Sequence, residues 1–146
     1  LAKAGYQTEL VGKLHLWPHR KRYGFEHLTW ADSPRSPNDY TDWLRDNGAT
    51  AIEPGIAHGI SMNGWVGRPS HLPEEMEHTN WCVNEAMRFL MRRDPAAPFF
   101  LWVSFFAPHP PLAPPRVYYD RYMDVDLPEP VVGDWAPRFD QPLKGL

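Results

Sequence analysis

The chain has 146 residues and a formal net charge of −3, and its length fits one domain. This charge gives no general attraction to nucleic acid, and no apolar run reaches the roughly 20 residues of a membrane-spanning helix. The 17 prolines are more than twice the roughly 5% of an average chain. Because proline interrupts helices and sheets, much of the chain is predicted to be loop.

The first half of the chain predicts one strand and one helix, separated by loops. Residues 1–4 resemble the last turn of a helix that ends on a glycine. Gln7–Gly12 has the length and the β-branched residues of a short strand. Residues 17–36 are predicted to be mostly loop, with a short extended piece at Phe25–Trp30. Pro37–Asn47 is predicted to be a helix because its apolar residues recur at helical spacing.

The second half of the chain predicts longer elements. Residues 49–72 are rich in glycine and are predicted to be irregular. Pro73–Arg93 is predicted to be one long helix, with acidic residues near its start and arginines near its end, an order that suits the helix dipole. Phe99–Phe106 is an apolar run without alternation, which is typical of a strand buried on both faces. A short helix is predicted at Pro115–Tyr122, and extended chain after Asp124.

The order of these elements predicts an α/β fold with a parallel sheet and flanking helices. Only Gln7–Gly12 and Phe99–Phe106 are convincing strands by sequence. Two parallel strands cannot cover themselves, so further strands are expected from elsewhere. The chain also opens within an element, and we therefore expect it to be an internal piece of a longer protein.

A lysine and a histidine follow the first predicted strand. In an extended chain, Lys13 and His15 are two residues apart and point to the same side. A fixed positive charge then lies beside a group that exchanges protons near neutral pH. The alternative interpretation is an exposed lysine and histidine on a loop.

Another histidine follows the second predicted strand. His109 lies between two prolines, and a residue before a proline is held in an extended conformation. Ligands of open α/β sheets bind beyond the carboxyl ends of the strands. If the strands are parallel, Lys13, His15 and His109 converge on one edge of the sheet, in a cluster that suits a tetrahedral oxyanion. The alternative is a proline-rich turn with an incidental histidine.

The residues around these groups resemble the sulfatase family. Gly5-Tyr6-Gln7-Thr8, followed by Gly12-Lys13-Leu14-His15, is similar position by position to the second sulfatase signature. Further segments occur in the same order as in the family: Leu72-Pro73-Glu74-Glu75, Thr79-Asn80-Trp81, Pro98–Leu101, Ala107–Pro111 and Tyr118–Tyr122. The resemblance covers residues 1 to about 130.

The resemblance implies an alkaline-phosphatase-like α/β fold and hydrolysis of the sulfate esters of small molecules or carbohydrates. It also implies a formylglycine nucleophile, made from Cys or Ser in a Cys/Ser-x-Pro-x-Arg motif, and a bound calcium ion. By this resemblance Lys13 contacts the sulfate and the formylglycine. His15 hydrogen-bonds the formylglycine hydrate and helps to eliminate sulfate from it. His109 binds a sulfate oxygen on the leaving-group side.

The chain departs from the family at the nucleophile and the metal. No Cys/Ser-x-Pro-x-Arg motif is present in the 146 residues. Cys82 lies inside the long predicted helix, where it is predicted to be a small buried hydrophobe. The family's calcium ligands fall outside the matching region, so Asp32, Asp39 and Asp120 are predicted to be surface residues or helix caps. Residues 1–146 are expected to be an internal part of a sulfatase catalytic domain that is inactive alone.

Several other residues carry weaker signals. Three histidines lack the spacing of metal ligands and are predicted to be structural or exposed: His58, His71 and His78. Trp30 and Trp65 line either a substrate pocket or the core. The basic run at residues 19–22 is either a solvated loop or a feature that attracts an anionic substrate.

Two other functions stay open at the level of sequence. A phosphonate or phosphodiester hydrolase of the same superfamily would bind an oxyanion of the same shape with the same residues. A truncated, non-catalytic module would need no nucleophile. The sequence indicates neither the sulfated substrate, nor the compartment, nor the oligomeric state.

Overall fold

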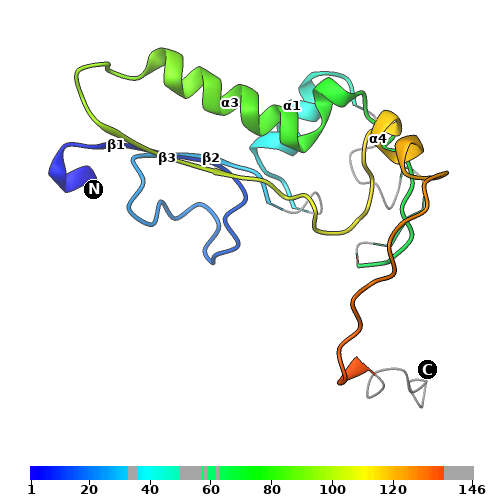
Figure 1. The fold of residues 1–146 in the computed structure, drawn as a ribbon. Helices are drawn as coiled ribbons and strands as arrows, with labels where there is room; N and C mark the ends of the chain where they lie inside the picture. The colour runs from blue at the N-terminus through cyan, green and yellow to red at the C-terminus, as the bar shows by residue number, and fades with distance from the viewer. Residues whose placement is uncertain (33–35, 50–56, 58, 62, 137–146) are drawn as a thin grey trace.

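A parallel sheet of three strands forms the centre of the molecule. The computed structural model describes residues 1–32, 36–49, 57, 59–61 and 63–136. Its strands are β1 (Gln7–Gly12), β2 (His27–Trp30) and β3 (Phe99–Ser104), in the order β2-β1-β3 (Figure 1). Both strand pairs are parallel. The predicted α/β fold with a parallel sheet is therefore confirmed.

The strand β2 forms where the sequence predicts only a short extended piece. Its alignment with β1 begins at Glu26, whose backbone N–H donates to the Thr8 carbonyl oxygen at 3.1 Å. The Glu26 carboxylate in turn accepts a hydrogen bond from the Thr8 backbone N–H at 2.9 Å. Since β2 has only four residues, this pairing rather than a pattern of its own makes it a strand.

The helix α3 (His78–Arg92) covers one face of β1 and β3 (Figure 1). Its buried residues recur at helical spacing and face the sheet: Trp81, Cys82, Ala86 and Phe89. Trp81 and Cys82 join Val11 of β1 in the hydrophobic core. This packing fixes α3 over the ends of the strands from which the candidate site extends.

The helix α1 (Asp39–Asp46) packs against β2. It begins two residues later than Pro37, the predicted start, because Asn38 and Thr41 cap each other's backbone in a capping box. Its buried Tyr40 and Leu44 complete the core beside α3.

The long helix predicted at Pro73–Arg93 is interrupted. A short 3-10 helix, η2 (Glu74–Met76), precedes α3, and Glu77 between them has an extended backbone. The Tyr40 hydroxyl donates a hydrogen bond at 2.9 Å to the Met76 carbonyl oxygen, which a continuous helix would use internally. The prediction of one helix is therefore wrong, because a tertiary contact replaces a helical bond at this point.

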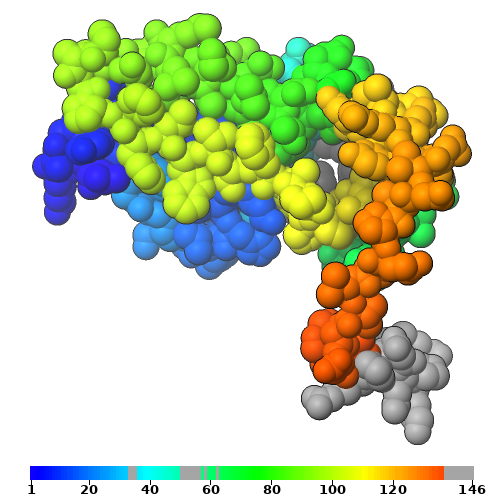
Figure 2. Space-filling view, in the orientation of Figure 1, coloured from blue at the N-terminus to red at the C-terminus, as the bar shows by residue number. Residues whose placement is uncertain are grey.

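The prediction that β3 is buried on both faces is also wrong. Phe99 and Trp102 are 40% and 49% exposed. Among the described residues β3 pairs only with β1, so it lies at an edge of the sheet. The strand also ends at Ser104 rather than Phe106. In Figure 2 this segment, coloured yellow-green to yellow, lies open on the surface that faces the viewer.

The two ends of the described chain extend from this body. The predicted helix end appears as η1 (Ala2–Ala4), and the predicted short helix as α4 (Arg116–Arg121). Beyond α4, residues 123–136 run away from the sheet (Figures 1 and 2). In the described part of the chain, no helix has the length and apolar character needed to cross a membrane.

Candidate active site

The carboxyl ends of the three strands are held together around Gly12. Its φ of 98° is in the left-handed region, and a Cβ at this position would overlap the Ser104 carbonyl oxygen. The Lys13 backbone N–H donates to that same oxygen at 2.9 Å, and the Ala31 N–H donates to the Gly12 carbonyl at 3.0 Å. The residues that follow β1, β2 and β3 are thus gathered at one edge of the sheet.

Lys13 extends its ammonium group over an aromatic ring. Its Nζ lies 4.7 Å from the centre of the Phe106 ring, in a cation–π contact. Within the described part of the chain, Lys13 forms no ion pair. Its positive charge is therefore not neutralised by a carboxylate and is available to an anion.

His109 lies against the same ring and is exposed to solvent. The ring centroids of His109 and Phe106 are 4.9 Å apart. The Nδ1 atom of His109 lies 2.6 Å from the Pro110 carbonyl oxygen. Since a carbonyl only accepts, Nδ1 carries the proton, and Nε2 is the atom that can reach a ligand. In the neutral ring Nε2 accepts a hydrogen bond, and only the imidazolium form donates from it.

His15 is placed beside a buried carboxylate. Its side chain is 84% exposed, and its Nδ1 lies 3.9 Å from Oδ1 of Asp32. Asp32 is only 6% exposed, so its predicted place on the surface or at a helix cap is wrong. It comes two residues after β2, at the carboxyl edge of the sheet, and it lines the pocket beside His109.

The other two acidic residues, Asp39 and Asp120, have different surroundings. Asp39 is the first residue of α1, next to the cap Asn38, and its Oδ2 accepts from the Trp30 N–H at 2.6 Å. Asp120 is exposed on α4, as predicted. Asp39 also pairs with Arg20 at 2.7 Å, so the basic run at residues 19–22 is partly tied to the fold.

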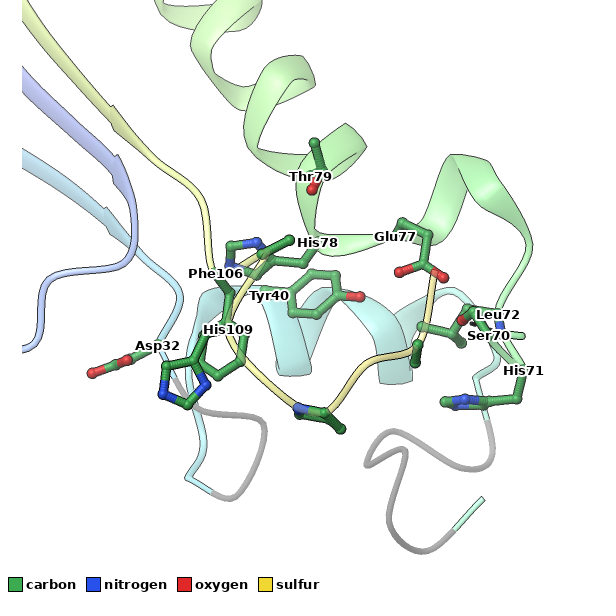
Figure 3. Close-up of a pocket in the computed structure, with 13 residues that line it drawn as sticks. Asp32, Tyr40, Ser70, His71, Leu72, Glu77, His78, Thr79, Phe106 and His109 are labelled. Carbon is green, nitrogen blue, oxygen red and sulfur yellow. Dashed lines mark hydrogen bonds between the residues drawn. The ribbon is translucent and has the colours of Figure 1, made fainter. Parts of the chain in front are cut away.

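A pocket of about 110 Å³ opens beside His109. Figure 3 shows His109 and Asp32 on one side, Tyr40 in the middle and Glu77 on the opposite side. Phe106 and His78 form part of its wall. Burial raises the pKa of Glu77 above its usual range, and it raises the pKa of Tyr40 as well. The pocket therefore favours uncharged forms of groups that are ordinarily acidic.

His78 is a pocket residue that the sequence did not single out for function. Its Nε2 lies 3.3 Å from the Ala31 carbonyl oxygen, and its Nδ1 lies 3.6 Å from the Cys82 sulfur. Burial lowers the pKa of His78, and the charge of Lys13 acts in the same direction. The ring is thus a neutral, fixed part of the wall. Its place directly before Thr79, in a segment that resembles the family, is the nearest signal that the sequence offers.

The remaining predicted residues have structural places. Cys82 is fully buried, as predicted, and burial raises the pKa of its thiol to about 12. Trp30 packs in the core, whereas Trp65 is 94% exposed. Neither tryptophan lines the pocket beside His109. His71 does line it, and His58 lies outside the described residues.

The described residues do not fit a calcium ion. No group of three or more His, Cys, Asp or Glu side chains among them is arranged to hold a metal. Calcium requires six to eight oxygen ligands, and Asp32 alone is far short of that number. We therefore assign these residues no role as ligands of a metal ion.

Comparison with known proteins shows the family to which this chain is similar. The chain is 40% identical to the arylsulfatase of Clostridium perfringens over 99% of its own length and 33% of that protein. It is 28% identical to the choline-sulfatase of Rhizobium meliloti, over 91% of the chain and 27% of that protein. It is 30% identical to the multifunctional alkaline phosphatase superfamily protein PehA of Trinickia caryophylli, over 63% of the chain and 19% of that protein.

The chain therefore spans about a third, or less, of the length of these relatives. The family model named Sulfatase matches residues 1–129, which include all three strands and the groups at their carboxyl ends. The three-stranded parallel sheet with flanking helices is consistent with part of an alkaline-phosphatase-like sulfatase domain. The chain belongs to the sulfatase family.

Proposed function

We propose that this chain is an internal part of a sulfatase catalytic domain and supplies sulfate-binding and proton-transfer groups for the hydrolysis of a sulfate ester. The observation that carries the proposal is the shared contact of Lys13 and His109 with Phe106, at the carboxyl edge of a sheet that matches the sulfatase family. The greater length of the relatives supports the expectation that further parts of the domain complete the site.

In this proposal Lys13 and His109 bind the sulfate group. Lys13 offers a charge that no described carboxylate neutralises, and a fixed charge at short range stabilises the oxyanion. His109 meets a sulfate oxygen through Nε2, because Nδ1 is bonded to the Pro110 carbonyl. To donate to that oxygen His109 is in the imidazolium form, and the same proton is then available to a leaving group.

His15 is the second proton-transfer group of the proposal. Its exposure leaves the imidazole free to reach a reacting atom, and Asp32 lies 3.9 Å from its Nδ1. By the family resemblance His15 hydrogen-bonds the formylglycine hydrate and assists release of sulfate from it. The 146 residues contain no Cys/Ser-x-Pro-x-Arg motif, so in this proposal the nucleophile comes from another part of the protein.

A phosphodiester or phosphonate hydrolase is the second candidate. It is favoured by the similarity to PehA, whose name places it in the alkaline phosphatase superfamily. Sulfate and phosphate groups are both tetrahedral oxyanions, so the same basic residues serve either. The ratio of kcat/KM for a nitrophenyl sulfate to that for a bis-nitrophenyl phosphate decides between them, and a ratio well below one would reject the sulfatase.

Alanine substitutions in the complete protein test the site assignment. Replacing Lys13, His15 or His109 is expected to lower kcat/KM about 10²–10³-fold, the usual loss for one preorganised charged donor. The loss for a general acid or base is similar, about 10²–10⁴-fold. Stability is expected to change by less than about 1 kcal/mol because these side chains lie outside the core.

The control is His27→Ala, which removes an exposed histidine at the start of β2, away from the carboxyl edge. It is expected to keep both turnover and melting temperature. If His109→Ala melted early yet kept near-normal turnover per folded molecule, His109 would be structural. The pH profile separates the roles further. Loss of one limb in His15→Ala, but not in Lys13→Ala, identifies His15 as a proton-transfer group.

A further inference from the structure

Phe106 lies at the centre of the candidate site without being one of its charged groups. Lys13 Nζ is 4.7 Å from its ring centre, and the His109 ring centroid is 4.9 Å away. A third ring, that of His78, lies edge-on to it at 6.3 Å. The two groups assigned to sulfate binding therefore share one aromatic neighbour.

An aromatic ring suits this position better than a carboxylate does. A lysine side chain has many rotamers, and holding its ammonium in one place requires an attractive partner. A carboxylate would hold it but would cancel the charge that an oxyanion needs. The negative face of a ring attracts the ammonium while leaving its net charge intact. Phe106 meets this requirement for Lys13.

The ring itself is held by the segment that carries His109. The His109 backbone N–H donates to the Phe106 carbonyl oxygen at 3.1 Å, which closes the turn between the two residues. Just before this turn, the Ser104 carbonyl accepts from the Lys13 N–H. His78, fixed by its own bond to Ala31, supports the ring from α3. The position of Phe106 is thus fixed by the His109 turn, by the pairing of Ser104 with Lys13 and by His78 of α3.

We propose that Phe106 is a positioning residue whose ring holds both the Lys13 ammonium and the His109 imidazole at the proposed sulfate-binding edge. This inference rests on the proposed function, because it explains how the two proposed sulfate-binding groups are held in place. It adds a specific role for an uncharged residue that touches no reacting atom. It also predicts that the aromatic character of residue 106, rather than its size alone, is what matters.

The contact can be measured without any reaction. In the complete protein labelled with ¹³C-lysine, the Hε signal of Lys13, assigned by its loss in Lys13→Arg, is expected to be shifted by the ring current of Phe106. Phe106→Leu keeps an apolar side chain but removes the ring, and it is expected to return this signal to its ordinary position. Phe106→Tyr retains a ring and is expected to keep the shift.

The consequence is measured with kinetics and with inorganic phosphate as an anion probe. Phe106→Leu is expected to weaken phosphate inhibition and to lower kcat/KM by about 2- to 30-fold, the range of a cation–π contact. Phe106→Tyr is expected to restore both. Phe105→Leu is the matched control, because it changes the neighbouring phenylalanine, which is exposed and, among the described contacts, has no ring contact with Lys13 or His109. It is expected to leave both quantities unchanged.

The proposal is overturned if Phe106→Leu leaves the Lys13 signal and the phosphate affinity at wild-type values. It is also overturned if Phe106→Tyr and Phe106→Leu are equally impaired at normal melting temperature. Failure of the proposed function gives a different result. In that case the wild-type protein hydrolyses neither sulfate nor phosphate esters, while the signal of Lys13 and the binding of phosphate still report on Phe106.

Discussion

Replacing Gly12 by alanine is the most direct test of how the site is built. Gly12 has a φ of 98°, which costs an alanine about 1–2 kcal/mol. The added methyl group would also overlap the Ser104 carbonyl oxygen and lie 3.0 Å from the Cys82 sulfur. Cys82 is fully buried and the Ser104 carbonyl is held in the sheet, so neither can easily move away, and overpacking of this kind costs about 1–3 kcal/mol more. We therefore expect Gly12→Ala to lower the free energy of unfolding by about 2–5 kcal/mol.

The matched control is Gly24→Ala. Gly24 has nearly the same φ, 96°, but a Cβ there meets nothing within 4 Å. Urea denaturation of both variants separates the two costs, because only Gly12→Ala adds the clash to the backbone strain. If the two variants lost the same free energy of unfolding, the close approach of β1 and β3 at Ser104 would be refuted.

Four further predictions concern buried groups and activity. The Cys82 thiol, with a pKa of about 12, is expected to react with a thiol reagent only after denaturation. Because the unfolded thiol titrates near 9.0 and the folded one does not, stability is expected to fall as the pH rises above that value, measured as the urea midpoint. Burial lowers the pKa of His78 below 6.5, so the unfolded chain binds a proton that the folded chain excludes. Stability is therefore expected to fall as the pH drops below 6.5. The control variant His27→Gln, which keeps His78, is expected to show the same fall. The purified 146-residue chain is expected to show no turnover of aryl sulfates, and metal-dependent turnover by it would contradict the proposed function.

The elements with strong local signals were predictable from sequence. β1 has the bounds that its β-branched residues and terminal glycine predict, and α4 falls within the predicted range. The elements that depend on distant contacts were predicted only in part, since β2 was expected as a short extended piece and α3 as part of a longer helix. β2 requires the pairing of Glu26 with Thr8, and the break before α3 requires the Tyr40 hydroxyl from another helix. A single sequence carries no direct signal of such contacts.

The site divides in the same way. Lys13, His15 and His109 could be named because each follows a predicted strand within a recognisable motif. The buried Asp32 and the pocket residue His78 could not, because their environments are assembled from segments far apart in the chain. Phe106 could not be predicted as a site residue for a different reason. By sequence it is the last residue of a predicted apolar strand. Its proposed role depends on its contact with Lys13, which follows β1.

The described contacts of Lys13 and His109, the proposed sulfate-binding groups, lie within this chain. The bond of Lys13 to the Ser104 carbonyl, the Phe106 ring and the anchor of His109 on Pro110 involve residues 13–110 alone. In the proposed function, binding the sulfate and attacking it are tasks of different groups, because the basic side chains bind the anion and a nucleophile attacks it. A fixed, uncompensated charge costs little at an exposed sheet edge and becomes effective when water is excluded from it. In the proposed function, the parts of the domain that bring the nucleophile also exclude water, and this exclusion strengthens the field of the Lys13 charge.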